Sequence, residues 1–512
     1  MMNLEKDKPR KSRFGSANNT LVYYIAVLVI AGVIYGVTCA PTVLWQDSGL
    51  LVYRILNHDI QGNLGIALAH PLYIIIGFIT RLIPFGDPAY KINLISVVFG
   101  ALTIANLYLL LRLLKVALCP ALVGAASLAL AWTFWQNAVI AEVYTLYTAI
   151  LFLELVILLQ FINTGKTAYL YLLGFLNGLS IANHLWGVFP LACYVVFMFV
   201  LLFHRRIVLK HLGIFILCWA AGAAPYEYLI IKNIIISGDV AGTLSSAVFG
   251  NGWCHSVLNA SISGKIMLEN CVFILLNFPT PNIILFFVGL WACWKTIPQK
   301  PLKYIIFALM VLFFIFAFRY KVPDRHAFFI PFYCIAAVFF SMGASYIFQR
   351  FKNKTLVVAV IIFSLFPIPA YFLTPAVARQ YYKPLAMRRQ RPYRDEYTYW
   401  LQPWKTGYDG AEKFAREALE SVEADAVLYA YTTDVHCLFY IQQVYNVRPD
   451  VKIVSDHDCG PNAPVFNSET IDDLLREFPV YVSSKKQSYC PDFVRKNYDF
   501  VKKGILWQVV KK

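Results

Sequence analysis

The chain has 512 residues, of which 59% are hydrophobic and only 14% are charged. A water-soluble protein carries about 25% charged residues, so the composition argues against a soluble enzyme. The net charge of +16 comes mostly from short basic loops between apolar runs, a pattern typical of membrane topology, and we expect no nucleic-acid partner.

The N-terminal segment, residues 1–19, is basic and leads into an apolar run over residues 20–40. This run is longer than the apolar region of a signal peptide and has no convincing small-residue cleavage site, which favours an uncleaved anchor with a cytoplasmic N-terminus. Long apolar runs then recur as far as residue 373. They predict a polytopic α-helical membrane domain over residues 20–374.

The first apolar run ends at Pro41-Thr-Val-Leu-Trp-Gln-Asp-Ser-Gly49, which places Asp47 close to the membrane surface. A poorly solvated carboxylate is costly there unless it is paired or hydrogen-bonded. One interpretation is structural, with Asp47 capping a short helix through residues 48–51. The other is catalytic, with Asp47 as a base that reaches a lipid-borne substrate.

The segment 66–85 is apolar enough to span a membrane, but His70-Pro71 breaks its start and Arg81 interrupts it. If this segment lies at the outer interface, the later basic loops all face the cytoplasm, as the positive-inside rule requires. We therefore expect eleven spans and a C-terminus outside. The spans are predicted at about 20–40, 91–112, 117–135, 143–162, 168–184, 187–203, 212–231, 282–296, 303–319, 328–348 and 355–373.

This topology places a set of polar residues on the outer side, where each alone has an ordinary structural explanation. The set comprises Asp47, His70, Glu142, His184, Glu227 and the turn Arg319-Tyr-Lys-Val-Pro-Asp-Arg-His326, which holds Arg319, Lys321, Asp324 and Arg325. Glu154 differs because it falls in the middle of a span, as either a functional acid or a hydrogen-bonded structural one. The outer loop 232–265 is long and rich in glycine, serine and asparagine, which is typical of a functional or partly mobile segment.

The character of the chain changes after the last span. A basic, aromatic linker over residues 375–405 precedes a pattern of alternating helices and strands over residues 406–512. This pattern predicts a small extracytoplasmic α/β domain. It has no phosphate-binding glycine loop and no nucleophile elbow. Cys437, Cys459 and Cys490 fall in this domain, and at most one pair of them could form a disulfide in an oxidising compartment.

An enzyme on the outer face must draw its activated group from a lipid, because nucleotide sugars and ATP are absent there. A sugar linked to polyprenyl phosphate fits this requirement. A carboxylate could take the proton from an attacking hydroxyl, and Arg or Lys could offset the charge on the leaving phosphate. Asp47 could supply the carboxylate, and the 319–326 turn could supply the cations.

Several stretches in fixed order make the chain resemble the GT-C superfamily of membrane glycosyltransferases. Within it, the chain is similar to a family first catalogued as a domain of unknown function, which includes protein O-mannosyltransferases. The matching stretches are Pro41–Gly49, Ala69-His-Pro-Leu-Tyr73, Asn93-Leu-Ile-Ser96, Ala138-Val-Ile-Ala-Glu-Val-Tyr144, Gly178-Leu-Ser-Ile-Ala-Asn-His184 and Val322-Pro-Asp324. The resemblance implies that Asp47 is the catalytic base of an inverting transfer from a polyprenyl-phosphate sugar.

We therefore predict a glycosyltransferase that moves a sugar, with mannose as a candidate, to a hydroxyl of a protein or glycan acceptor. Asp47 is the predicted base; His70, Glu142, His184 and Asp324 would bind substrate, and Arg319, Lys321 and Arg325 would contact the phosphate. No metal or other cofactor is indicated, since the first loop has no clustered ligands. The alternatives are a transporter or lipid flippase without covalent chemistry, and a non-catalytic scaffold.

Overall fold

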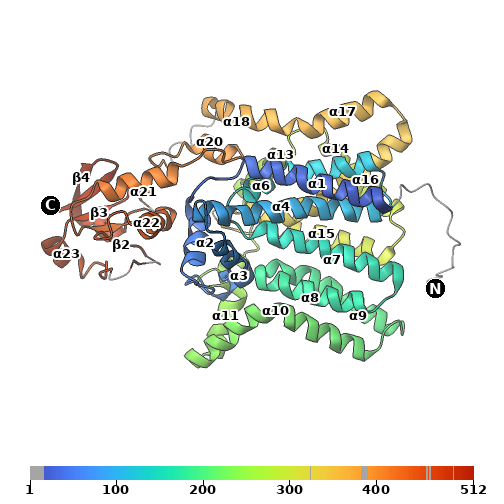
Figure 1. Ribbon diagram of the computed structural model, residues 1–512, viewed down its shortest axis with the longest axis horizontal. Coiled ribbons are helices and arrows are strands. Elements are labelled where there is room, and N and C mark those ends of the chain that lie inside the picture. The colour runs from blue at the N-terminus through green and yellow to red at the C-terminus, as the bar shows by residue number, and fades with distance from the viewer. Residues whose placement is uncertain (1–16, 323, 382–389, 457–458, 461–462, 488) are drawn as a thin grey trace.

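The computed structural model describes residues 17–322, 324–381, 390–456, 459–460, 463–487 and 489–512. Within them, seven helical segments are long and apolar enough to cross a membrane. They contain α1 (Ala17–Val37), α4 (Pro88–Leu113), α7 (Tyr144–Thr164), α9 (Val188–Phe203), α10 (Leu209–Ser237), α15 (Lys300–Arg319) and α16 (Ile330–Phe351). The chain is thus an integral, multi-pass membrane protein (Figure 1).

Two bent pairs of helices are further candidate spans. α5 (Leu118–Ala129) and α6 (Trp132–Ala138) meet at 70°, and α17 (Lys354–Leu365) and α18 (Pro367–Tyr381) meet at 47°, which gives up to nine spans in the described residues. The remaining predicted spans appear as α8 (Ala168–Asn183) and α14 (Ile283–Thr296), with 16 and 14 residues. Since a perpendicular crossing needs about 20 apolar residues, the count of eleven is not confirmed.

Several short helices, among them α2 (Gln46–Leu56), α3 (Pro71–Gly77) and α11 (Val240–Phe249), lie at the end of the bundle that faces the C-terminal domain (Figure 1). The segment 66–85 forms no single spanning helix, because Pro71 starts a new helix and Gly77 ends it. Much of the predicted outer loop 232–265 is helical. The short elements are α2 (Gln46–Leu56), η1 (Ile66–Leu68), α3 (Pro71–Gly77), η2 (Phe78–Leu82), η3 (Leu185–Gly187), α11 (Val240–Phe249), α12 (Cys254–Val257), α13 (Gly264–Asn277) and η4 (Ala327–Phe329).

The C-terminal part confirms the predicted small α/β domain. Its sheet has the order β2-β1-β3-β5-β4, with β1 parallel to β2 and β3 and with β5 antiparallel to β3 and β4. The strands are β1 (Val427–Tyr429), β2 (Lys452–Val454), β3 (Val480–Val482), β4 (Tyr498–Lys503) and β5 (Leu506–Lys511). The helices are α20 (Glu396–Leu401), α21 (Gly410–Glu420), α22 (Thr432–Tyr445), α23 (Ile471–Glu477) and α24 (Asp492–Asn497). All eleven cysteines are free, including the three of this domain.

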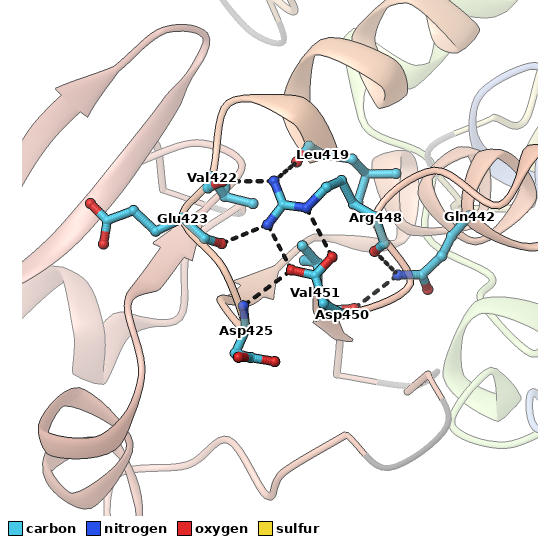
Figure 2. Close-up of polar contacts among 8 residues, drawn as sticks. All are labelled: Leu419, Val422, Glu423, Asp425, Gln442, Arg448, Asp450 and Val451. Carbon is cyan, nitrogen blue, oxygen red and sulfur yellow. Dashed lines mark hydrogen bonds and ion pairs between the residues drawn. The ribbon is translucent and has the colours of Figure 1, made fainter.

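The turn between α22 and β2 is held by Arg448, whose guanidinium donates to both oxygens of Asp450 (Figure 2). The same guanidinium donates to carbonyl oxygens in the last turn of α21 and just after it, and Asp450 accepts the N–H of Asp425. These carbonyls belong to Leu419, Val422 and Glu423. Bidentate, charge-assisted bonds of this kind fix geometry as well as energy, so this turn sets the spacing between α21, α22 and the sheet.

The α/β domain packs directly against α2 through α22. The rings of Tyr53 and Phe439 stack at 5.0 Å, and the side-chain amides of Asn57 and Gln443 exchange hydrogen bonds of 3.1 and 3.2 Å. Nearby, the hydroxyl of Tyr440 donates to Asp87, the residue that caps α4. The domain therefore holds both α2 and the start of α4 at this end of the bundle.

Candidate functional site

Asp47 lies in the first turn of α2, directly after the first spanning helix. The N-cap residue is Trp45, and no side chain caps this helix, so the capping role considered for Asp47 is not observed. Gln46 has a φ of +58°, a left-handed conformation that residues other than glycine adopt at an energetic cost. Trp45 is buried and donates through Nε1 to the hydroxyl of Tyr408 at 2.8 Å, which anchors the backbone next to Asp47.

Two side chains of α4 join the Asp47 loop to the loop that precedes α7. Asn93 Nδ2 donates to the carbonyl oxygens of Ala40 and Thr42, and its Oδ1 accepts the N–H of Ala141 at 2.8 Å. Ser96 Oγ lies 3.1 Å from both the carbonyl oxygen and the amide nitrogen of Glu142. Asn93 and Ser96 thus place Asp47 and Glu142 relative to each other.

We expect Asn93→Ala to cost about 2–4 kcal/mol of unfolding free energy, because it leaves three buried backbone groups without a partner. It should also slow the reaction proposed below, since both loops lose their clamp. Asn106→Ala is the matched control: Asn106 lies on the same helix but bonds Ala149 and Tyr24 in neighbouring helices. Denaturant titration and rates measured well below both melting temperatures would test this; equal rates in the two variants would contradict it.

Three carboxylates converge at this place, from α2, from the loop before α7 and from the 320–326 turn. We call Asp47, Glu142 and Asp324 the acid cluster. The Asp47 side chain is exposed, yet the protein atoms around its carboxylate partly desolvate it, and this desolvation together with the charge of Asp324 raises the pKa of Asp47 to about 7. Burial, followed by the charges of Asp47 and Asp324, raises the pKa of Glu142 well above its usual range. Asp47 is therefore poised to exchange a proton near neutral pH, and the surroundings of Glu142 favour its protonated form.

The predicted histidines lie together as well. The rings of His70 and His184 stack at 5.3 Å, although they come from the start of α3 and the end of α8. Tyr144 joins them to the acid cluster, since its ring lies 5.9 Å from that of His184 and its hydroxyl is within electrostatic reach of all three acids.

The predicted phosphate contacts differ in their surroundings. Arg319 Nη1 donates to the carbonyl oxygens of Val257 and Asn259, and Arg325 is buried against Glu269 and Asn270. Lys321 is exposed, and its side chain has no polar partner among the described residues. Pro323, part of the Val322-Pro-Asp324 stretch, lies outside the described residues. Lys321 is thus the cation of this turn that is open to a ligand.

A segment of the C-terminal part lies against the region around the acid cluster. Residues 391–408, which we call the strap, include Arg394, whose guanidinium lies 5.3 Å from the ring of Trp45. Trp400 accepts a hydrogen bond from Trp132 Nε1 through its carbonyl oxygen, and the N–H of Lys405 donates to Thr38. Tyr399 of the strap lies within electrostatic reach of Glu142. The strap therefore forms one wall of the region around the acid cluster.

Glu154 lies apart from these groups and is fully buried within α7. It accepts hydrogen bonds from Ser180 at 2.7 Å and Tyr194 at 2.9 Å, and Asn177 approaches both of its oxygens. This is the structural role considered for it. Among the described residues, no group of three or more His, Cys, Asp or Glu side chains is arranged to hold a metal ion.

Comparison with known proteins supports the resemblance. The model of the protein O-mannosyl-transferase TMEM260 N-terminal domain matches residues 67–207. The mouse protein O-mannosyl-transferase TMEM260 is 25% identical over 219 residues, which is 41% of this chain and 30% of that protein. The chain thus spans less than a third of the length of this relative.

Solved structures extend the similarity over nearly the whole chain. ArnT from Cupriavidus metallidurans, bound to undecaprenyl phosphate, superposes with a TM-score of 0.62 at 13% identity, covering 96% of this chain and 98% of that one. The chain has the GT-C fold. The Archaeoglobus fulgidus oligosaccharyltransferase tethered to an acceptor peptide superposes with a TM-score of 0.53 at 15% identity, covering 90% and 69%. The predicted GT-C architecture, helical bundle plus C-terminal domain, is confirmed.

Several residues that position the candidate site could not be recognised from the sequence. Asn93 and Ser96 stood in a matching stretch but had no assigned role, and Arg54, Tyr144 and Tyr399 were not singled out. The only signal available was polarity within apolar runs, which does not reveal the partner of a side chain.

Proposed function

We propose that this GT-C protein is a membrane glycosyltransferase that transfers a sugar from a polyprenyl-phosphate donor to a hydroxyl of a protein or glycan. The observation that carries the proposal is Asp47, an accessible carboxylate with a pKa of about 7 at the end of a GT-C bundle. The undecaprenyl phosphate named in the ArnT structure supports a lipid-phosphate donor, and the name of the mouse relative supports mannose and a protein acceptor.

In the proposed reaction, Asp47 accepts the proton of the acceptor hydroxyl as its oxygen bonds to the anomeric carbon. The bond from that carbon to the phosphate oxygen breaks on the opposite face, so the configuration inverts, and the lipid phosphate leaves with the electron pair. Lys321, with the remaining donors of Arg319, would offset the charge on this phosphate. Arg325 would act indirectly by holding the turn against α13.

The other two acids would hold substrate. Glu142, kept protonated, would donate a hydrogen bond to a hydroxyl, while Asp324 would accept one and raise the basicity of Asp47 through its charge. The site would face the extracytoplasmic side, with the N-terminus in the cytoplasm, as the positive loops predict.

The test is transfer of labelled sugar by the purified full chain. Undecaprenyl- and dolichyl-phosphate mannose would be supplied with a serine- and threonine-containing peptide, and the product would be mapped by mass spectrometry. Label on a peptide hydroxyl is the expected result. Donor carried across reconstituted vesicles without covalent change would contradict the proposal and favour a flippase.

A further inference from the structure

The stacked histidines have defined tautomers, because each ring makes a hydrogen bond whose direction is fixed by a backbone group. His70 Nδ1 lies 2.7 Å from the carbonyl oxygen of Asn183, which can only accept, so His70 carries its proton on Nδ1. His184 Nδ1 accepts the N–H of Trp186 at 3.1 Å, so His184 carries its proton on Nε2. The two Nε2 atoms are therefore complementary: one accepts and the other donates.

Both imidazoles are neutral at physiological pH. Burial lowers the pKa of His70 to about 4, with the positive charge of the nearby Arg54 acting in the same direction. Burial and the neighbouring His70 lower the pKa of His184 well below its usual range. A neutral pair gives little electrostatic attraction to a phosphate but offers one donor and one acceptor to an uncharged hydroxyl.

The backbone holds the two rings in place. His70 has a φ of +49° directly before Pro71, and Arg54 Nη2 donates to the carbonyl oxygen of Ala69 at 2.8 Å. The ring of His184 lies against Trp186, with the ring centroids 4.0 Å apart. Neither Nε2 atom has a protein partner among the described residues, and neither is among the buried unpartnered atoms. Both therefore reach accessible space.

We propose that the Nε2 atoms of His70 and His184 form a hydroxyl-recognition subsite for the donor sugar. His184 Nε2–H donates to a hydroxyl oxygen of that sugar, and His70 Nε2 accepts a hydroxyl hydrogen from the same sugar. The subsite rests on the proposed transfer. It adds to that proposal the part of the donor that the two histidines bind, namely the hydroxyls of its sugar. The lipid phosphate lies elsewhere, on the side of Lys321.

Substitution of each histidine with asparagine or with glutamine distinguishes the roles of the two ring nitrogens, Nδ1 and Nε2. Asparagine places its amide near Nδ1, so His184→Asn and His70→Asn keep the bonds to Trp186 and Asn183 but lose the outer contact. Glutamine reaches the Nε2 position and restores the outer contact without the inner one. We expect each asparagine variant to lower kcat/KM for the mannose donor about tenfold, the usual effect of one lost hydrogen bond. The glutamine variants should recover part of this loss.

The deciding comparison uses a short-chain polyprenyl-phosphate mannose and its monodeoxy analogues. The kcat/KM of the wild type should fall about tenfold on one or two of the analogues. The asparagine variant of the histidine that contacts the missing hydroxyl should show no further fall in kcat/KM on those analogues. The subsite would be overturned if each variant lost the same kcat/KM on every analogue, or if both asparagine variants kept wild-type kinetics. It would also be overturned if the variants were sensitive to changes in the acceptor instead of the donor.

A binding measurement keeps this test separate from the proposed function. The thermal shift produced by the bare lipid phosphate should be the same in wild type and the asparagine variants, whereas the extra shift from its mannosyl form should fall in the variants. A wild type that binds the mannosyl lipid in this way but never transfers the sugar would contradict the transferase and leave the subsite supported. An unchanged extra shift in both variants would contradict the subsite alone. Monodispersity in detergent confirms that each variant is folded.

Discussion

Asp47→Asn is expected to reduce sugar transfer by about 10²–10⁴-fold, the usual contribution of a general base. Asparagine keeps the shape of the side chain but cannot take the proton of the acceptor hydroxyl. Wild-type kcat/KM should rise with pH and level off above about 7, where Asp47 is ionised, and the variant should lack this rise. Label transfer to the peptide at several pH values measures both effects.

Asp473→Asn, a surface change on α23, is the matched control and should leave transfer unchanged.

The Asp47 variant should also melt at a higher temperature than wild type above pH 7. An acid whose pKa is raised by folding costs stability once ionised, so this gain should shrink as the pH falls toward the usual Asp value of 3.8. Full transfer by Asp47→Asn would remove Asp47 from the mechanism.

Arg391→Met is expected to destabilise the attachment of the strap by about 3–5 kcal/mol, because it leaves the carboxylate of Asp434 buried without its partner. The two side chains form an ion pair of 2.5 Å and are almost fully buried, at 1% and 0% exposure. Asp434 lies in the first turn of α22, which follows β1, at the carboxyl end of the parallel strands. It also accepts a hydrogen bond from the hydroxyl of Ser483, which follows β3. This pair therefore fixes the strap to the sheet.

The double variant Arg391→Met with Asp434→Leu provides the control. Removing both charges should recover much of the loss, since an apolar pair of similar size often replaces a buried ion pair without penalty. Thermal unfolding of the full chain and the rate of tryptic cleavage in the strap would report the difference. A single variant as stable as wild type, or no recovery in the double variant, would show that the pair does not hold the strap.

The sequence was most informative where a local pattern decides the structure. Apolar run length placed Asp47 just beyond the first helix, and alternating helix and strand patterns predicted the small α/β domain that contains β1, α22, β2 and β3. The hairpin β4–β5 was missed because Tyr498–Lys503 is mostly exposed and has little apolar alternation. The sequence indicated the length of the loop 232–265 but not its helices, of which α11 packs against η1 and α10.

The arrangement of the candidate site could be predicted only in part. The positive-inside rule grouped Asp47, Glu142 and Asp324 at one end of the bundle, but their mutual approach depends on Asn93 and Ser96 on a separate helix. The stacking of His70 on His184 joins residues 114 positions apart, and no local pattern encodes such a contact. The roles of all these residues stay predictions until the variants above are measured.

The contact of α22 with α2 limits how this protein can be re-engineered or can diverge. A chimera that receives its C-terminal domain from a distant homologue would keep the new sheet but mismatch Tyr53, Asn57 and Asp87, the surfaces that α22 covers. Transplanting the domain together with residues 45–57 and 87 should restore the fit. The C-terminal domain and the loop that carries Asp47 would then be inherited as one unit.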